Sequence, residues 1–380
     1  MSIKYYLILW LILVFAVLCR AQTAPVESFK NIADSKPLEP TRAILRAFDD
    51  FPLVAIGEMH GGNEQAIFFR TLIQHPEFPN KVKIIVLEAL NSKYQNVVDD
   101  YIAGKKISLK TLRPAWRDLV SSALGPMDSP NLELLLATIR QVNQKLSPAK
   151  RIRVLAGDPP IDWSKIRNGE DFSPWLEQRD VHYARVVENE VLAKGQKALL
   201  IIGAVHLERS PFRGDDLSKA LMLQILDKKN PGKTFVVLPH LGFSERNAEL
   251  EAKMVNWKRP SLVILKGSWL GEVESAGLLE DVMIDKDGNP TPVAVPKTFL
   301  KEKADAYLYL GPINTLTMEQ RNPLLFNDAV YFRELNRRFM LVNGHPLDKA
   351  ELMKPRPKKY FDNWGGGSII YNNPPAEKKP

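Results

Sequence analysis

The chain has 380 residues, of which 45% are hydrophobic and 25% charged, and this balance excludes collagen-like, wholly disordered and disulfide-stapled proteins. Its 52 lysine and arginine residues against 44 aspartate and glutamate residues give a net charge of +8, but no basic run is interleaved with aromatic residues. We therefore interpret the positive charge as a contribution to solubility and expect no nucleic-acid partner.

The amino-terminal segment has the pattern of a signal peptide. Fourteen consecutive apolar residues, Tyr5 to Leu18, follow Lys4 and precede Ala21. This run is too short to span a membrane, and cleavage after Ala21 would leave small residues on either side of Arg20, as signal peptidases require. We expect residues 1–21 to be removed and the mature chain to be periplasmic or secreted, without a stable membrane span. The alternative is an uncleaved membrane anchor.

Cys19 is the only cysteine in the chain, so cleavage after Ala21 would leave none. A chain without thiols forms no disulfide and has no cysteine nucleophile or cysteine metal ligand. Catalysis in the mature chain would therefore depend on histidine, carboxylate or hydroxyl groups, or on a bound ion.

Short runs rich in Val, Ile and Leu lack polar alternation, which is typical of strands that are covered on both faces. Helical patterns lie between them, and this order predicts parallel strands joined by right-handed crossovers. We expect an α/β fold, with a mostly parallel β-sheet and helices on both faces, in a single large domain over residues 22–340. The predicted strands are Leu53–Ile56, Val82–Leu87, Ile152–Ala156, Ala198–Ile202, Phe235–Leu238, Leu262–Leu265 and Ala306–Leu310.

Two insertions interrupt the expected domain. The first, about residues 91–130, is irregular and is a candidate lid or substrate wall. The second, about residues 270–300, contains Asp287-Gly288-Asn289-Pro290, which predicts a hairpin turn. Residues 341–380 are expected to form a tail that is partly disordered. The predicted helices are Asn63–Gln74, Leu132–Leu146, Leu176–Leu192, Asp216–Asp227 and Asn327–Arg338.

Polar residues follow the predicted strands at their carboxyl ends, where open parallel sheets bind ligands. Glu58 and His60 follow the first strand, Glu88 ends the second, Asp158 follows the third and His206 follows the fourth. Glu58 and His60 are two residues apart and point to the same side of an extended chain, so one can orient the other. Each residue alone is compatible with packing, but buried charges need partners. We therefore expect these five residues to form one catalytic cluster.

The segments Gly57-Glu58-Met59-His60 and Gly203-Ala204-Val205-His206, with Glu88 between them, resemble a known superfamily. It joins ChaN-like haem-uptake proteins, erythromycin esterases and the Tiki/TraB proteins, and the resemblance extends over roughly Leu53 to Leu310. The spacing of Glu58 and His60 is more similar to the ChaN-like branch, because these residues are typically one position further apart in the erythromycin esterases.

The resemblance implies an α/β fold with its site at one edge of the sheet, and it carries over Glu58, His60, Glu88 and His206 as site residues. Asp158 is added from its place at a strand end. Activity differs between the branches. The esterase branch is similar to a water-activating hydrolase, the Tiki branch looks like a metal-dependent protease, and ChaN-like proteins bind haem. The departure from the esterase spacing counts against macrolide hydrolysis.

The first hypothesis from these residues is a hydrolase that cleaves an ester or amide bond in a small molecule or a peptide. His60, oriented by Glu58 or Glu88, would take a proton from the attacking water. His206 would stabilise the oxyanion or protonate the leaving group.

A second hypothesis adds a divalent metal ion, which would lower the pKa of a bound water molecule in a protease-like hydrolase. Mixed imidazole and carboxylate ligands suit Zn or Mn. The fold would have to assemble the ligands, because the sequence contains no compact ligand motif. The candidate ligands are His60, His206, Glu58, Glu88 and Asp158.

Two further hypotheses involve no hydrolysis. The chain would bind haem, which needs an axial histidine or tyrosine, and Tyr94 and Tyr101 in the first insertion are the available tyrosines. Alternatively, it would be a scaffold of the cell envelope in which Glu58, His60 and His206 can be replaced without effect.

Overall fold

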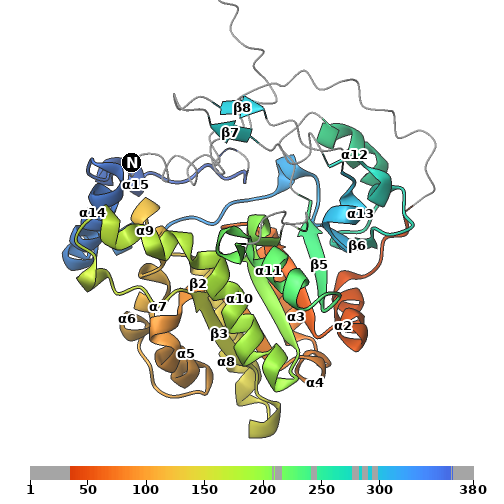
Figure 1. The fold of residues 1–380 in the computed structure, drawn as a ribbon, viewed down its shortest axis with the longest axis horizontal. Coiled ribbons are helices and arrows are strands. Elements are labelled where there is room, and N and C mark those ends of the chain that lie inside the picture. Colours follow the sequence, from red (N-terminus) through yellow and green to blue (C-terminus); the bar gives the residue numbers. More distant parts are fainter. Residues whose placement is uncertain are drawn as a thin grey trace, which may run out of the picture. The chain divides into compact units, whose positions relative to one another are not determined.

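The computed structural model describes residues 35–207, 209, 216–240, 246–275, 282–284, 290–292, 298–360 and 362 (Figure 1). The expected signal peptide, residues 1–21, lies outside these ranges. Within them, no helix is both long and apolar enough to cross a membrane. The chain divides into two compact units, and the larger unit comprises Pro40–Val237 and Glu319–Pro355.

The larger unit is built on parallel strands in the order β3-β2-β4-β1-β5. Their Val, Ile and Leu side chains are covered on both faces, and Val54, Val86 and Leu200 are fully buried. The register places Glu58, the last residue of β1, opposite Gly203, the last residue of β4. The strands are β1 (Leu53–Glu58), β2 (Ile84–Asn91), β3 (Arg153–Asp158), β4 (Ala198–Gly203) and β5 (Thr234–Pro239).

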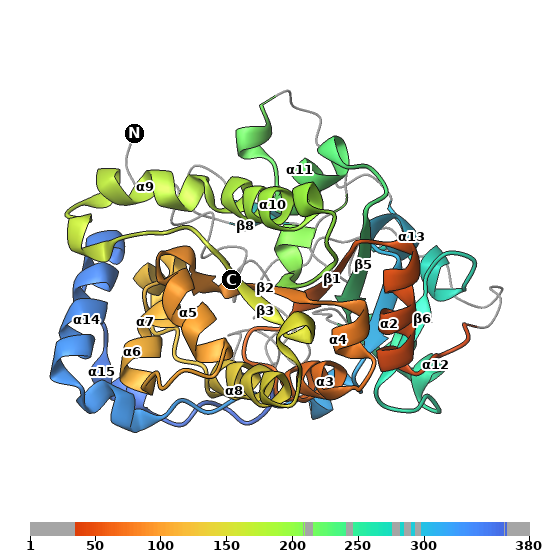
Figure 2. The same cartoon turned by 90° about the horizontal axis from the view of Figure 1, so that it is seen from below.

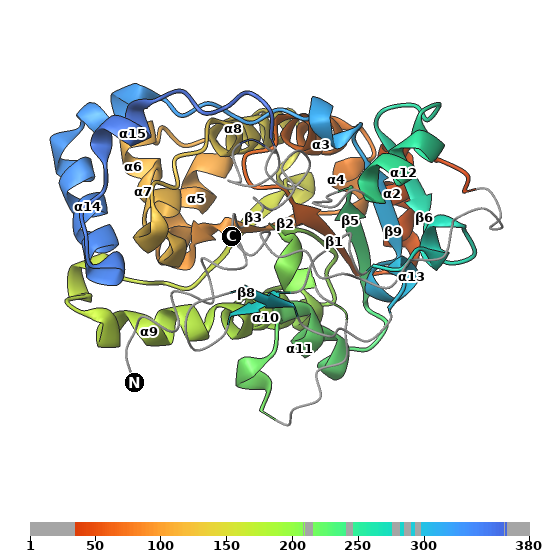
Figure 3. The same ribbon diagram turned by 90° about the horizontal axis from the view of Figure 1, so that it is seen from above.

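Helices cover both faces of these strands, as Figures 2 and 3 show. Helices α3 and α8 pack together on one face, and α10 and α11 pack together on the opposite face. The helices of this unit are α2 (Pro40–Asp50), α3 (Asn63–Gln74), α4 (Phe78–Lys81), α5 (Gln95–Ile102), α6 (Leu109–Leu112), α7 (Pro114–Arg117), α8 (Pro130–Gln144), α9 (Gly169–Glu177), α10 (Arg179–Glu190), α11 (Met222–Lys229), α14 (Ala329–Asn343) and α15 (Lys349–Met353).

The first predicted insertion, residues 91–130, contains α5, α6, α7 and a 3₁₀ helix, Val120–Leu124. Helix α14 packs on this 3₁₀ helix. Arg338 of α14 donates to the carbonyl of Arg117 at 2.9 Å and pairs with Asp118 at 2.7 Å. These contacts hold the insertion to a helix near the end of the chain.

The smaller unit comprises the described residues within Met1–Glu39, Leu238–Met318 and Arg356–Pro380, so the boundary between the units falls inside β5. In this unit β6 and β9 pair antiparallel, with Leu262 opposite Leu308. Strands β7 and β8 also pair antiparallel, and Asp287, Gly288 and Asn289 of the predicted turn lie outside the described residues. The elements are α12 (Arg246–Met254), β6 (Ser261–Ile264), β7 (Val282–Ile284), β8 (Pro290–Pro292), α13 (Leu300–Lys303) and β9 (Ala306–Tyr309).

The predicted α/β fold class is confirmed, and each predicted strand overlaps a strand of the sheet. The predicted helix Asn63–Gln74 has the bounds of α3. The predicted helix Leu176–Leu192 is wrong as a single element, because the backbone of Gln178 leaves the helical region and separates α9 from α10. Within residues 341–360, the chain completes α14 and forms α15.

Candidate functional site

The predicted site lies where β1 and β4 end next to each other. Strand β1 leads into α3 on one face of the sheet, and β4 leads toward α11 on the opposite face (Figure 3). Open α/β sheets bind ligands at the carboxyl ends of neighbouring strands whose connections leave to opposite faces. The topology therefore selects the ends of β1 and β4, which carry Glu58, His60 and Gly203.

Glu58 and His60 form the accessible part of the site. Oε2 of Glu58 contacts Nδ1 of His60, while the His60 side chain stays 53% exposed and that of Glu58 27% exposed. Gln65 holds the loop around them by accepting a hydrogen bond from Met59 N at 2.6 Å and donating one to Gly57 O at 2.7 Å. The imidazole is thus held through Nδ1, while about half of its side chain stays exposed.

Glu88 is buried behind this pair. Its Oε2 accepts a hydrogen bond from the backbone N–H of Gly203 at 2.5 Å, and its Oε1 lies 3.0 Å from Nη2 of Arg179 and 3.5 Å from Nε2 of His206. A Cβ atom at Gly203 would lie 3.0 Å from Oε2 of Glu88 and 3.4 Å from Nε2 of His60. The absence of a side chain at this position therefore lets His60 and Glu88 approach each other.

Asp158 is completely buried and has several donors. It accepts hydrogen bonds from Nε of Arg179 at 3.2 Å, the hydroxyl of Tyr183 at 3.1 Å and the backbone N–H of Val120 at 2.7 Å. Arg179 thus bridges Asp158 and Glu88, and Val120 ties the insertion to the same carboxylate. Asp158 acts as an internal anchor of the site.

His206 is also enclosed, with a side chain only 5% exposed. Its Nδ1 lies 2.7 Å from Oδ1 of Asp180, its Nε2 faces Glu88, and its ring packs edge-on against Tyr183 with centroids 5.1 Å apart. The sequence hypothesis assigned His206 to the oxyanion or the leaving group. Because both ring nitrogens face carboxylates, the structure instead places it as a support for Glu88.

The carboxylates around the two histidines favour their protonated forms. Attraction to Glu58 raises the pKa of His60 to about 9. Burial disfavours a charged His206, but Asp180 and Glu88 outweigh this effect and raise its pKa to about 9. Both imidazoles therefore bind a proton more tightly than a histidine in water does.

The two buried carboxylates respond to their surroundings in opposite directions. Burial disfavours ionised Glu88, but the charges of His206 and Arg179 hold its pKa well below the usual range. For Asp158 burial is the stronger effect, and it raises the pKa to about 6 although Arg179 lowers it. The network therefore keeps the buried carboxylate of Glu88 fully ionised at neutral pH.

The proton on His206 makes stability depend on pH. Its pKa is 6.5 unfolded and about 9 folded, so its stabilisation is complete below pH 6.5 and is lost as the pH rises through 9. The shift corresponds to roughly 3 kcal/mol. We expect urea unfolding between pH 6.5 and 9.5 to show this decline, and His206→Gln to flatten it. His60 contributes less, because it is half exposed. Equal slopes for the two proteins would contradict the assignment.

The donors of this site do not fit a metal ion. Among the residues that the structure describes, no group of three or more His, Cys, Asp or Glu side chains is placed to hold one. The guanidinium of Arg179 lies against Glu88, where its positive charge would repel a metal cation, and both nitrogens of His206 already face carboxylates. The geometry therefore does not support the predicted zinc or manganese site at His60, His206, Glu58 and Glu88.

The two tyrosines predicted for haem are engaged elsewhere. Tyr94 donates its hydroxyl hydrogen to Asp118, and burial together with this bond raises its pKa, which opposes the phenolate that would bind iron. The ring of Tyr101 lies against Arg140, with the guanidinium carbon 4.8 Å from the ring centroid. The structure thus gives each of these side chains a partner outside the Glu58–His60 pair.

Tyr101 also lies toward the amino ends of the strands, opposite the ends that carry the predicted site. Asp99, two residues before it on α5, pairs at 3.1 Å with Arg153, the first residue of β3. Asp158 is the last residue of the same strand. Tyr101 is therefore near the amino ends of the strands, whereas His60 follows a carboxyl end.

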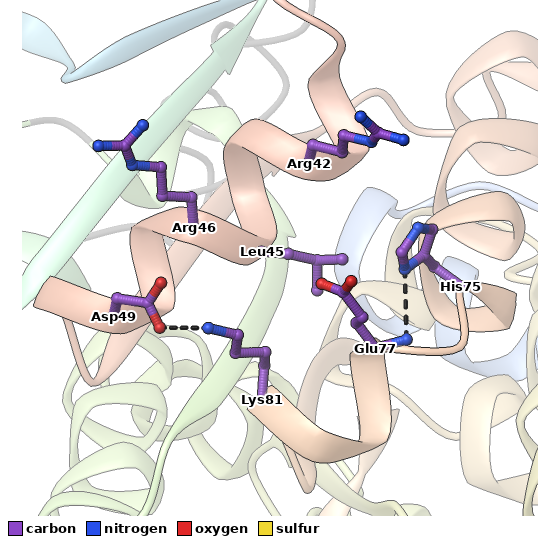
Figure 4. A pocket seen from close by; sticks show the side chains of 7 residues that line it. All are labelled: Arg42, Leu45, Arg46, Asp49, His75, Glu77 and Lys81. Carbon is purple, nitrogen blue, oxygen red and sulfur yellow. Dashed lines mark hydrogen bonds and ion pairs between the residues drawn. The ribbon is translucent and has the colours of Figure 1, made fainter.

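A cavity of about 450 Å³ also lies near the amino ends of the strands (Figure 4). It is bounded by α2, which ends just before β1, and by α4, which ends just before β2. Lys81 of α4 pairs with Asp49 of α2 across it, as Figure 4 shows. None of the predicted site residues lines this cavity. The lining residues are Arg42, Leu45, Arg46, Asp49, His75, Glu77 and Lys81.

No protein-family model matches the chain, and no curated protein matches it. Several solved structures do match the chain. The erythromycin esterase EreC is 12% identical, with a TM-score of 0.44 over 70% of this chain and 92% of that chain. A succinoglycan biosynthesis protein is 11% identical, with a TM-score of 0.49 over 76% and 93%. ChaN of Campylobacter jejuni, a structure with cofacial haem, is 16% identical, with a TM-score of 0.35 over 57% and 93%.

The esterase and ChaN represent two of the branches named in the resemblance drawn from the sequence.

The residues that sequence reasoning missed are Arg179, Asp180 and Tyr183 on α10. Arg179 and Tyr183 are four residues apart and therefore share one face of a helix, but nothing in their spacing distinguishes a buried face from a solvated one.

Proposed function

We propose that the protein is a hydrolase in which His60 acts as a general base on the water that attacks an ester or amide bond. The observation that carries this proposal is the contact of Nδ1 of His60 with Glu58 on an imidazole that is still half exposed. Once the ring has lost its second proton, which happens as the pH rises toward 9, its Nδ1 proton is donated to Glu58 and its Nε2 lone pair can accept a proton from water.

The buried groups support this pair electrostatically. Glu88 lies beside His60, and its negative charge stabilises the imidazolium that forms when His60 takes the proton. Arg179 and His206 fix Glu88, and Asp158 fixes Arg179. These four residues are positioning residues, and Glu58 and His60 are the groups within reach of a substrate.

In this reaction the water oxygen bonds to the carbonyl carbon while its proton passes to Nε2 of His60. The bond from that carbon to the alcohol oxygen or amine nitrogen then breaks, and His60 returns the proton to the leaving group. The products are a carboxylic acid and an alcohol or amine. The step needs no oxidant, reductant or metal ion.

We further propose that the protein is exported and that its substrate is a small molecule or a peptide bound against the insertion 91–130. The leader pattern of residues 1–21 supports export. The hydrogen bond from Val120 to Asp158 supports the second point, because it joins the insertion to the network behind His60.

The proposed hydrolysis is tested with a panel of p-nitrophenyl esters and aminoacyl p-nitroanilides. We expect turnover of at least one class, and a fall in kcat of about 10²- to 10⁴-fold for His60→Ala. Turnover should persist after treatment with a chelator, because the donors of the site do not fit a metal.

His345→Ala is the matched control, because His345 is exposed and its side chain lies against two groups near it in the sequence, the carbonyl of Pro346 and the ring of Phe339. This variant should hydrolyse the panel at the wild-type rate. Equal turnover by His60→Ala and the wild type would show that another group activates the water. Loss of turnover on chelation would show that a metal ion does so.

A further inference from the structure

The loop that carries His60 is held from a second side by a residue far along the chain. Gly61, directly after His60, has a φ of 77°, a conformation that favours glycine, and its carbonyl accepts a hydrogen bond from the backbone N–H of Glu319 at 2.8 Å. Gln65 holds the other part of this loop through Met59. The exposed histidine therefore lies between two points of attachment.

The side chain of Glu319 is buried and is itself anchored. Its Oε2 accepts hydrogen bonds from the hydroxyl of Ser129 at 2.9 Å and the backbone N–H of Asn131 at 3.0 Å, at the first turn of α8. A carboxylate is favoured there because the first N–H groups of a helix lack partners within it and carry partial positive charge. The carboxylate therefore fixes the position of the Glu319 backbone.

The contacts close into a ring around the loop. Asn131 donates from Nδ2 to Oδ1 of Asn63 at 3.0 Å, and Asn63 is the first residue of α3, two positions after Gly61. Glu319 thus binds the loop directly at Gly61 and, through the start of α8, at Asn63. A shift of α8 or of Glu319 would be transmitted to both ends of the turn after His60.

We propose that Glu319 is a positioning residue for His60, which it holds in contact with Glu58 by anchoring the Gly61 carbonyl to the start of α8. This inference rests on the proposed function, since it concerns the same base. The backbone N–H of residue 319 survives any substitution other than proline. Loss of the carboxylate therefore loosens the attachment of the loop without removing the bond to Gly61.

The test compares Glu319→Ala with Glu319→Gln, whose amide oxygen can still accept from Ser129 and Asn131. For Glu319→Ala we expect kcat to fall about 10- to 100-fold with KM unchanged, because a small displacement of a reacting group slows the chemical step. The pKa of His60, followed by NMR with ¹³C-labelled histidine and assigned with His60→Ala, should move toward 6.5. Glu319→Gln should restore both values.

Asp328→Ala is the control for a purely structural effect. Asp328 caps α14, which is as long as α8, by accepting hydrogen bonds from the backbone N–H groups of Val330 and Tyr331. The Asp328→Ala variant should have a lower melting temperature than the wild type, but its kcat and the titration of its His60 should be unchanged. If Glu319→Ala behaves in the same way, Glu319 is only a helix cap and the inference is wrong.

The two proposals fail separately. If His60→Ala keeps wild-type turnover, the proposed hydrolysis by His60 is wrong, but the titration of His60 still decides whether Glu319 positions it. A His60 titration that is identical in the wild type and Glu319→Ala overturns the positioning role, whatever the activity of the protein.

Discussion

Replacement of Arg179 by methionine is expected to lower the free energy of unfolding at pH 7 by about 3–5 kcal/mol. The guanidinium lies 3.0 Å from Glu88 and 3.2 Å from Asp158, and all three side chains are buried. Methionine has a similar length but no charge, so both carboxylates would lose a cation that they cannot replace with water. Urea unfolding of the wild type and variant at one pH measures the difference.

The control for this prediction is Arg185→Met on the same helix, because Arg185 is exposed. It should change the free energy of unfolding by less than about 0.5 kcal/mol. A loss below about 1 kcal/mol for Arg179→Met would show that water or a rearranged partner already compensates the carboxylates.

The second large effect concerns the pH dependence of hydrolysis. In the wild type, kcat/KM should rise with pH until His60 has lost its proton, at about pH 9, because only the neutral imidazole accepts a proton from water. In Glu58→Gln the attraction that raises the pKa of His60 is gone. The rise should therefore move about two pH units lower, toward the ordinary value of 6.5.

The plateau of kcat/KM should also fall about 10- to 100-fold in Glu58→Gln. A base with a lower pKa takes up the proton less readily, and the amide holds the ring less firmly than the carboxylate does. Profiles from pH 5.5 to 10 measure both effects. Glu64→Gln, a matched change in the first turn of α3, should leave the profile unchanged. An unshifted profile in Glu58→Gln would show that Glu58 does not control the proton on His60.

The sequence by itself determined the strands and much of the crossover pattern. Uninterrupted apolar runs such as Leu53–Ile56 and Ala198–Ile202 cannot be solvated on either face, so they mark buried parallel strands wherever helical patterns separate them. The strand ends follow from the same runs. The sequence alone therefore places Glu58, Glu88 and Asp158 at the carboxyl ends of the strands.

The tertiary structure alone decided what each polar residue of that edge does. Glu58 and His60 are left accessible, whereas Glu88, Asp158 and His206 are buried with partners from α10. Nor could the sequence indicate that Glu319 would lie against Gly61, because nothing local to either residue depends on the other. Periodicity reports which faces avoid water. The pairing of buried charges depends on long-range contacts, whose energies are realised only when distant segments of the chain meet.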